Sequence, residues 1–357
     1  MTILWFTLAL VFSASLTARY FSVPAVNGPL YIHPNKFMAM IAALSIALVS
    51  GLRNNIGDTY LYMHSYVIND FRWESVVQTN DIAFNILQML LKQLSDDPQI
   101  LIVTTALVTN LIIAMVLFKY ARLYEISLYL YITTGAFTIS MNGIRQFLAA
   151  SIVFAATKFL LEGSWKKYMA VVLLASFFHQ SALVMIPIYF IVRRKAWTRT
   201  TGALLFVAIL IVMGFNQFSE LLFSAIKDTQ YGHYESFAEG GASVFRALVW
   251  VAPLLIAYFG REKLRVLFPK SDIFVNLSIV GAVLMVISTQ NWIFARIAIY
   301  FNLYQLILIA WVIKVFREKD QKLVYMIVLI LYFLFYFYES VIALGLEYKS
   351  DYLIWPI

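Results

Sequence analysis

The sequence predicts an all-α integral membrane protein of about twelve transmembrane segments, and three observations carry this prediction. Of the 357 residues, 62% are hydrophobic and only 13% are charged, too few to cover the surface of a soluble domain. The mean hydropathy is +0.79. Long apolar runs recur along the whole length, as they do in polytopic helical proteins, without the alternating segments of about ten residues that mark a β-barrel.

The apolar runs place the expected spans in chain order. They lie at roughly 3–18, 37–51, 99–118, 125–141, 144–161, 167–178, 181–192, 203–219, 245–259, 273–289, 293–315 and 323–345. The sixth and seventh have about 12 residues each, or about 18 Å of helix against a bilayer core of about 30 Å. We therefore expect a short, sunken or re-entrant hairpin at 167–192 with His179 near its tip, because short interrupted segments often build membrane sites.

The basic residues predict the orientation. Six alternate connections hold 19 of the 27 Lys and Arg residues, and the positive-inside rule places these connections in the cytoplasm. They contain Arg19, Lys36, Lys119, Arg122, Lys158, Lys166, Lys167, Arg193, Arg194, Lys195, Arg199, Arg261, Lys263, Arg265, Lys270, Lys314, Arg317, Lys319 and Lys322. Both termini are then expected outside. The net charge of +8 thus reflects orientation, and no nucleic-acid partner is expected because the charges form no basic face.

Two long connections are expected on the outer side of a single transmembrane domain that covers 1–357. The first, 52–98, contains a helix at 81–95 whose polar residues share one stripe, which is typical of an amphipathic helix lying in the membrane interface. The second, 220–244, is polar, aromatic and glycine-containing, which is typical of a flexible lid. Long ordered loops are often functional.

Arginines on the outer side are the first candidates for a binding site. Arg145 and Arg296 lie within the ends of apolar segments and Arg246 begins one, where charge is costly and marks a site unless the side chain snorkels to the interface. Arg53 follows the second expected span, close to Asp58. Because the guanidinium fork binds phosphate oxygens in pairs, we predict that these four arginines bind a diphosphate.

Aromatic residues near Arg296 are candidates for sugar binding. Trp292, Tyr300 and roughly Tyr304 share its helix face at four-residue spacing, although an ordinary aromatic belt at the interface would look similar. Tyr60 and Gln146, in the polar segments beside Arg53 and Arg145, complete the expected sugar contacts.

His179 is the first candidate for a general base, because a near-neutral histidine between two short apolar segments can take up a proton. Asp58 is the second. The chain has no cysteine, which excludes thiolate metal sites. Nucleotide-binding and metalloprotease motifs are not visible, and neither a metal nor a cofactor is expected.

Three segments together resemble the EpsG family of Wzy-like polysaccharide polymerases. They are GLRNNIGDTYLYMHSY, NGIRQFLAASIVFAATKFLLEGSWKKYMAVVLLASFFHQSALVMIPIYF and ARIAIYF. The resemblance implies a Wzy-like, GT-C-like helical bundle. It also implies that oligosaccharide repeat units carried on undecaprenyl diphosphate, as donor and acceptor, are polymerised at the outer face of a bacterial cytoplasmic membrane. A flippase and a chain-length regulator of the same pathway are the expected protein partners.

The chemistry expected from these residues is metal-independent glycosyl transfer. His179 or Asp58 would accept the proton of the attacking hydroxyl, and arginines would hold the departing diphosphate. Direct attack would invert the anomeric carbon, whereas Asp58 acting as a nucleophile would not. Two other classes stay open: a flippase or exporter of lipid-linked sugars, and a membrane acyltransferase that modifies surface sugars. The sugar, the linkage, and the choice among capsule, exopolysaccharide and O-antigen are also open.

Overall fold

The structure is a computed structural model that describes the whole chain except residues 26–29, 31, 227–239 and 354–357. It is 77% helical, and its two short strands, β1 (Val23–Pro24) and β2 (Ile32–His33), pair antiparallel. The all-α prediction is confirmed. The centre of the expected lid, 227–239, lies outside the described residues.

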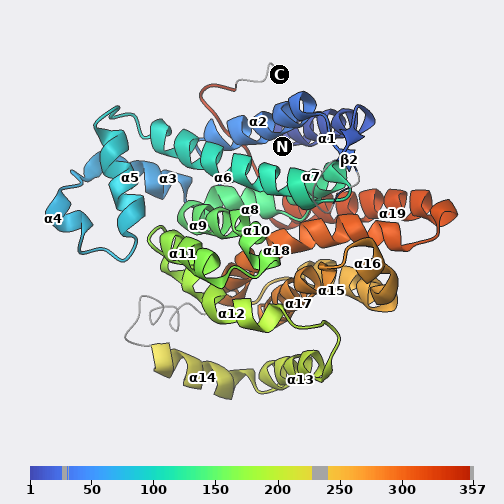
Figure 1. The fold of residues 1–357 in the computed structure, drawn as a ribbon. Coiled ribbons are helices and arrows are strands. Elements are labelled where there is room, and N and C mark those ends of the chain that lie inside the picture. The colour runs from blue at the N-terminus through green and yellow to red at the C-terminus, as the bar shows by residue number, and fades with distance from the viewer. Residues whose placement is uncertain (26–29, 31, 227–239, 354–357) are drawn as a thin grey trace.

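The order of the helices along the chain can be followed by colour in Figure 1. The first half of the chain forms α1 (Thr2–Tyr20), α2 (Lys36–Gly51), α3 (Thr59–Ile68), α4 (Trp73–Val76), α5 (Ile82–Lys92), α6 (Gln99–Tyr120), α7 (Tyr124–Thr133), α8 (Ala136–Asn142), α9 (Ile144–Ala155), α10 (Thr157–Glu162) and α11 (Trp165–Ser176). The second half forms η1 (Gln180–Val184), α12 (Met185–Val192), α13 (Arg199–Met213), α14 (Phe215–Ile226), α15 (Val244–Phe259), α16 (Arg261–Leu267), α17 (Ser271–Ile287), α18 (Ile293–Val312), η3 (Ile313–Val315), α19 (Glu318–Phe337) and η4 (Tyr338–Ala343).

The expectation of about twelve spans is not supported. By length and composition, four helices among the described residues can cross a membrane: Thr2–Tyr20, Gln99–Tyr120, Ile293–Val315 and Glu318–Ala343. The number rises to six if two bent pairs each count as one span: Arg199–Met213 with Phe215–Leu221, bent by 97°, and Val244–Phe259 with Arg261–Leu267, bent by 84°. The chain is therefore a multi-pass membrane protein with fewer full-length spans than its apolar runs suggest.

Some expected spans are missing because breaks in the backbone, which hydropathy does not reveal, divide the apolar runs into short helices. The apolar run 125–141 is divided into α7 and α8 by Gly135, which adopts the left-handed conformation at φ +81° that glycine tolerates best. The run 144–161 is divided into α9 and α10, and the hairpin at 167–192 consists of α11, η1 and α12. Each piece is too short to cross a bilayer core of about 30 Å.

Helix α18 forms the centre of the bundle and is buried along most of its length. It packs against α17 at Gly281, where an added Cβ would meet the Cβ of Phe301 at 2.9 Å. Small residues permit this close approach of membrane helices. At its far end, the Trp311 indole donates a hydrogen bond to the Tyr120 carbonyl at 2.9 Å. Helices α6 and α18 therefore finish side by side.

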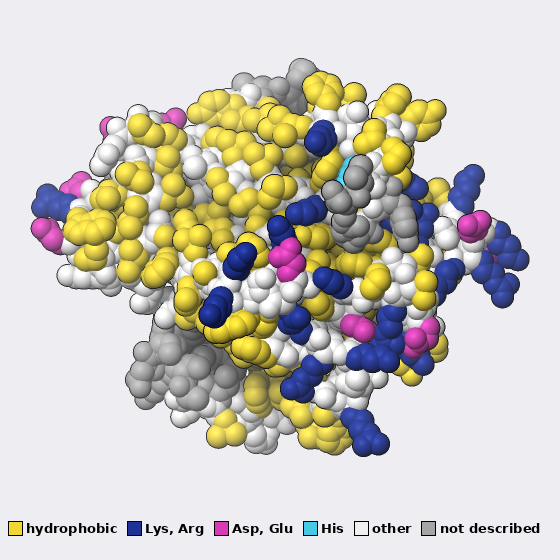
Figure 2. All heavy atoms as spheres, in the orientation of Figure 1, with side chains coloured by type: hydrophobic (Ala, Val, Ile, Leu, Met, Phe, Trp, Pro, Cys, Tyr) yellow, Lys and Arg dark blue, Asp and Glu magenta, His cyan; other side chains and the backbone are white. Residues whose placement is uncertain are grey.

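Most of the Lys- and Arg-rich connections contact one another. The contacts are Arg193 to the Leu160 carbonyl (3.2 Å), Lys270 to the Leu161 carbonyl (2.9 Å), Arg265 to the Ala196 carbonyl (3.2 Å), Lys263 to the Phe316 carbonyl (2.9 Å), and an ion pair between Arg19 and Glu125. We call this part of the bundle the basic end. The space-filling view shows Lys and Arg over the centre and right of the visible face and hydrophobic side chains over its upper left (Figure 2).

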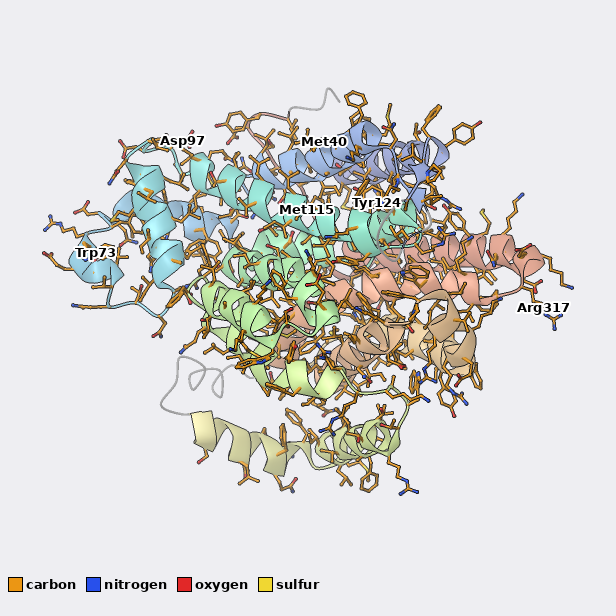
Figure 3. All side chains as sticks on the ribbon, viewed as in Figure 1. Met40, Trp73, Asp97, Met115, Tyr124 and Arg317 are labelled. Atoms are coloured by element: carbon orange, nitrogen blue, oxygen red, sulfur yellow. The ribbon has the colours of Figure 1, made fainter. Side chains whose placement is uncertain are left out.

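The candidate site lies away from the basic end. Helix α6 starts at Gln99, whose side chain donates hydrogen bonds to the Gly51 and Arg53 carbonyls at 2.6 and 3.1 Å, and it finishes at the basic end. Asp97, just before α6, and Arg317, in the last basic connection, lie on opposite sides of the molecule (Figure 3). Helix α18 likewise starts near Arg296 and finishes beside Tyr120. We call the end at which α6 and α18 start the site end.

Candidate functional site

Arg145 is the centre of the site. It lies in the first turn of α9, directly after the break at Gly143. Its Nη1 donates to Asp81 Oδ2 at 2.7 Å, and its Nε donates to the Tyr62 hydroxyl at 3.4 Å. The Arg145 side chain is 42% exposed, whereas that of Asp81 is 6% exposed. Arg145 is therefore anchored on one edge of its guanidinium while its side chain stays partly exposed.

Asp81 lies in the first long connection, 52–98, and places part of that connection beside Arg145. It is the N-cap of α5, and the neighbouring Ala83 amide donates to the Phe177 carbonyl at the end of α11 at 2.9 Å. Burial raises the pKa of the Asp81 carboxyl, and the charge of Arg145 opposes that rise. Part of the polar stripe of α5 faces protein groups, since Gln88 is buried and Lys92 donates to the Tyr66 and Val67 carbonyls.

His179 lies at the turn between α11 and η1 and forms a short polar chain. Its Nδ1 accepts a hydrogen bond from the Ser181 amide at 3.3 Å and lies 3.1 Å from the Ser181 hydroxyl. That hydroxyl lies 2.8 Å from the hydroxyl of Tyr300 on α18. Burial lowers the pKa of His179 to about 4, with further lowering by the charges of Arg145 and Arg296. The imidazole is therefore neutral near neutral pH.

Gln146 joins α9 to α18 and to the His179 turn. Its Nε2 donates to the Arg296 carbonyl at 2.9 Å and to the Ser181 hydroxyl at 3.4 Å. The Arg296 guanidinium lies over the Trp292 ring, 4.8 Å from the ring centroid. The structure thus brings together five residues that the sequence singles out: Arg145, Gln146, His179, Arg296 and Tyr300. Trp292 joins them through its cation–π contact.

Arg53 is placed differently from the other expected phosphate ligands. The residue is only 1% exposed, and its three guanidinium nitrogens bond Thr59 Oγ1 (2.9 Å), the Met141 carbonyl (2.5 Å) and the Ser50 carbonyl. Each of the three nitrogens that could donate to a phosphate thus already donates to a protein oxygen. We therefore assign Arg53 to holding the end of α2 against the end of α8.

The rest of the segment 53–58 is also a junction. Gly57, at φ +55°, lies so close to Asn142 that an added Cβ would meet its Oδ1 at 2.3 Å. The same oxygen accepts the Asp58 amide at 2.9 Å. Asn54 and Asn55 bond the C-terminal segment 347–351. The segment therefore holds the α8–α9 break, and with it Arg145, in position. Asp58 is half-buried beside this junction.

Three other predicted residues lie apart from this cluster. Arg246 forms an ion pair with Glu339 on η4 and borders a cavity of about 30 Å³, room for about two water molecules. Tyr304 is fully buried and its ring packs edge-on against Phe154 at 5.0 Å. Tyr60 is 67% exposed and stacks on His64. We leave Arg246 and Tyr304 out of the proposed binding site.

Sequence reasoning missed Asp81 and Ser181 as parts of the site. Asp81 sits on a polar stripe that looked like the water-facing side of an amphipathic helix, and no local signal reveals its pairing with a residue 64 positions away. Ser181 is different, because it belongs to the segment FHQSAL, whose two-residue spacing from His179 suits a side-chain contact within a turn.

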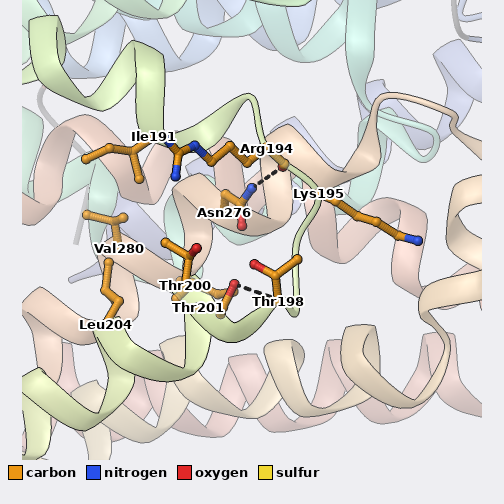
Figure 4. A pocket seen from close by; sticks show the side chains of 10 residues that line it. Ile191, Arg194, Lys195, Thr198, Thr200, Thr201, Leu204, Asn276 and Val280 are labelled. Atoms are coloured by element: carbon orange, nitrogen blue, oxygen red, sulfur yellow. Dashed lines mark hydrogen bonds between the residues drawn. The ribbon is translucent and has the colours of Figure 1, made fainter.

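The described residues offer no metal cluster, and at the basic end they line two pockets of different size. No three His, Asp or Glu side chains among them come together as metal ligands. The larger pocket, of about 610 Å³, is lined by described residues of 23–37 and by Phe118. The smaller pocket, between α12, α13 and α17, is lined by Arg194, Lys195 and three threonines (Figure 4), and its volume is only about 30 Å³. It holds about two water molecules.

The arrangement at the site end is suited to binding an anion with attached sugars. Arg145 and Arg296 bring two positive charges close to one neutral imidazole. Such groups bind phosphate oxygens by charge-assisted hydrogen bonds. The tyrosine hydroxyls and the indole ring nearby can contact sugar hydroxyls and sugar faces.

Comparison with known protein families identifies a family related to this chain. The model of the EpsG family matches residues 36–350, which contain every residue of the site. Neither the curated proteins nor the solved structures yield a match.

Proposed function

This chain belongs to the EpsG family, which indicates a role in polysaccharide biosynthesis, and from that premise we propose that it polymerises lipid-linked oligosaccharide repeat units. The single observation that supports this proposal most is the convergence of Arg145, Arg296 and His179 at one end of the bundle. These residues come from three helical segments that are far apart in the sequence.

The donor is a repeat unit linked to undecaprenyl diphosphate. Its diphosphate carries negative charge that must be stabilised as it leaves the sugar. Arg145 and Arg296 supply that stabilisation, which removes the need for a metal ion. Arg296 is presented over Trp292, and Arg145 is held on one edge by Asp81. Both guanidinium groups are thereby oriented before substrate arrives, which lowers the cost of binding.

The reaction is a transfer of the growing chain to a hydroxyl of the acceptor repeat unit. The acceptor oxygen forms a bond to the anomeric carbon, and the bond from that carbon to the diphosphate breaks. The hydroxyl proton passes to a base, and polyprenyl diphosphate leaves as an anion. The sequence suggests His179 or Asp58 for the base; the structure adds the buried carboxylate of Asp81.

The distribution of charge supports the membrane side that we propose for the site. The basic end gathers the connections that the positive-inside rule assigns to the cytoplasm. The site end then faces the outside of the cytoplasmic membrane, where repeat units already assembled on their carrier would arrive. A flippase of the same pathway would deliver them, and a chain-length regulator would act on the product.

Deletion of the gene tests this function in the cell. We expect short surface glycan and an accumulation of single lipid-linked repeat units at the outer leaflet, where an added glycosidase can reach them. Accumulation at the inner leaflet would contradict polymerisation and favour a flippase. Full-length glycan that lacks acyl groups would instead favour an acyltransferase.

A further inference from the structure

The hydrogen bonds around Ser181 include one donor whose direction is fixed, the side-chain amide of Gln146. Gln146 Nε2 donates to the Arg296 carbonyl at 2.9 Å, and a carbonyl only accepts, so the amide orientation of Gln146 is fixed. The same Nε2 therefore donates to the Ser181 hydroxyl oxygen at 3.4 Å. The Tyr300 hydroxyl lies 2.8 Å from that oxygen and can supply a second hydrogen bond to it.

Two groups of Ser181, its hydroxyl and its backbone amide, lie against His179 Nδ1. The Ser181 hydroxyl lies 3.1 Å from His179 Nδ1 and can donate its proton there when Tyr300 donates to Ser181. The Ser181 backbone amide also donates to Nδ1, at 3.3 Å. A ring nitrogen that accepts hydrogen bonds carries no proton, so in the neutral ring the proton is on Nε2.

We propose that Ser181 holds His179 in the tautomer protonated on Nε2, so that the imidazole donates a hydrogen bond to the leaving diphosphate and is not the base. This inference rests on the proposed function for the identity of the acceptor, although the tautomer itself does not depend on it. Ser181 is a positioning residue that acts through His179.

The opposite tautomer is disfavoured by geometry. A proton on Nδ1 would face the Ser181 amide hydrogen across 3.3 Å, which places two donors against each other. A base acting through Nε2 needs that tautomer, because only then does Nε2 carry a lone pair. The contacts at the turn thus leave Nε2 as a donor.

The surrounding charges agree with a neutral donor. Arg145 on α9 and Arg296 on α18 face the imidazole and, together with burial, lower the pKa of His179 to about 4. Asp81 is bonded to Arg145. A histidine of such low basicity is poorly matched to accept a proton at neutral pH. The acceptor proton then goes to a carboxylate, either Asp81 at the site or Asp58 beside the junction at Asn142.

The tautomer can be read directly by nuclear magnetic resonance. The chain has only four histidines, so protein labelled with ¹⁵N-histidine gives few imidazole signals, and His179→Gln identifies the relevant pair. We expect a protonated Nε2 and an unprotonated Nδ1 at every pH from about 5 to about 8. A protonated Nδ1, or a doubly protonated ring near neutral pH, would overturn the inference. Because no turnover is needed, this result stands even if the proposed function fails.

Substitution tests the consequence for catalysis. Glutamine places an amide donor near the position of Nε2, so His179→Gln should keep polymerisation within about tenfold of wild type, whereas His179→Ala should lose more. A general base would instead give a loss of about 10²–10⁴-fold in both variants. That outcome in folded His179→Gln protein would contradict the donor role.

Ser181 has a matched control in the same hairpin. Ser181→Ala removes the hydroxyl and should populate both tautomers and lower the rate, while Ser181→Thr keeps the hydroxyl and should restore the single tautomer. Ser176→Ala removes a hydroxyl that bonds only its own helix, at Leu173, and should change neither signal nor rate. An unaltered tautomer in Ser181→Ala would show that the backbone amide alone sets the proton and that Ser181 has no positioning role.

Discussion

Asp81 Oδ2 lies 2.7 Å from Arg145 Nη1, so the arginine that we propose for diphosphate binding already has an anionic partner. The carboxylate is almost completely buried, whereas Arg145 is partly exposed. A diphosphate at this site would lie close to a negative charge. Asp81 therefore orients Arg145 and at the same time weakens its attraction for substrate.

Removal of this charge should tighten anion binding. Asp81→Asn keeps an oxygen that can accept the Arg145 hydrogen bond but removes the competing charge, so pyrophosphate should bind about fivefold more tightly, equivalent to about 1 kcal/mol. Isothermal titration of the purified protein measures this. Asp96→Asn is the control, because Asp96 lies in the same connection with a 93% exposed side chain. Weaker pyrophosphate binding by folded Asp81→Asn would show that orientation outweighs competition.

Arg145→Lys should impair the enzyme although it keeps the charge. Lysine lacks the planar fork that can bond Asp81 and a phosphate together, and loss of one charge-assisted hydrogen bond costs about 1.5–3 kcal/mol. We expect activity to fall about 10- to 100-fold with a normal amount of folded protein. Arg72→Lys, at a site that is 77% exposed, should match wild type. Full activity of Arg145→Lys would contradict phosphate binding by the guanidinium fork and would leave Arg145 as a side chain that snorkels to the interface.

Gly57 and Gly345 form a matched pair for testing the junction at Asn142. Both have positive φ, +55° and +52°, and alanine in this region costs roughly 1–2 kcal/mol. At Gly57 the new Cβ would also meet Asn142 at 2.3 Å, whereas at Gly345 no heavy atom lies within 4 Å. Gly57→Ala should therefore lower the melting temperature more than Gly345→Ala, and should also reduce activity. Equal effects in thermal melts would refute the close approach at Asn142.

Orientation can be tested without background labelling because the chain has no cysteine. Cysteines at the exposed positions Ser75 and Asp96 should react with a membrane-impermeant thiol reagent in intact cells. Cysteines at Lys195 and Lys319, exposed at the basic end, should react only after lysis. The reverse pattern would place the site end in the cytoplasm and would contradict an outer active site.

Much of the site could be predicted because its residues violate local rules. Arg145, His179 and Arg296 are polar groups in or beside apolar segments, on the side where the positive-inside rule disfavours basic residues. This conflict identified them without any knowledge of the fold. The structure adds that they converge, and that Gln146 bonds both the Arg296 carbonyl and the Ser181 hydroxyl.

The remaining features depend on contacts between distant segments. The sequence predicts Arg53 as a phosphate ligand but does not reveal its contacts with Thr59 and Met141. The span count was too high because hydropathy reports composition, and it does not register a left-handed residue such as Gly135 or the 97° bend between α13 and α14. Backbone breaks of this kind are set by tertiary packing.

The central claim is that the site end joins repeat units by releasing polyprenyl diphosphate. Its most direct test uses purified protein with a polyprenyl-diphosphate oligosaccharide, a gel to separate products, and a phosphate assay on the released lipid. We predict a ladder with steps of one repeat unit and one polyprenyl diphosphate released per linkage, strongly reduced in Arg145→Lys and unchanged in Arg72→Lys. A wild-type protein that binds the substrate, but neither lengthens it nor releases its lipid diphosphate, would contradict the account.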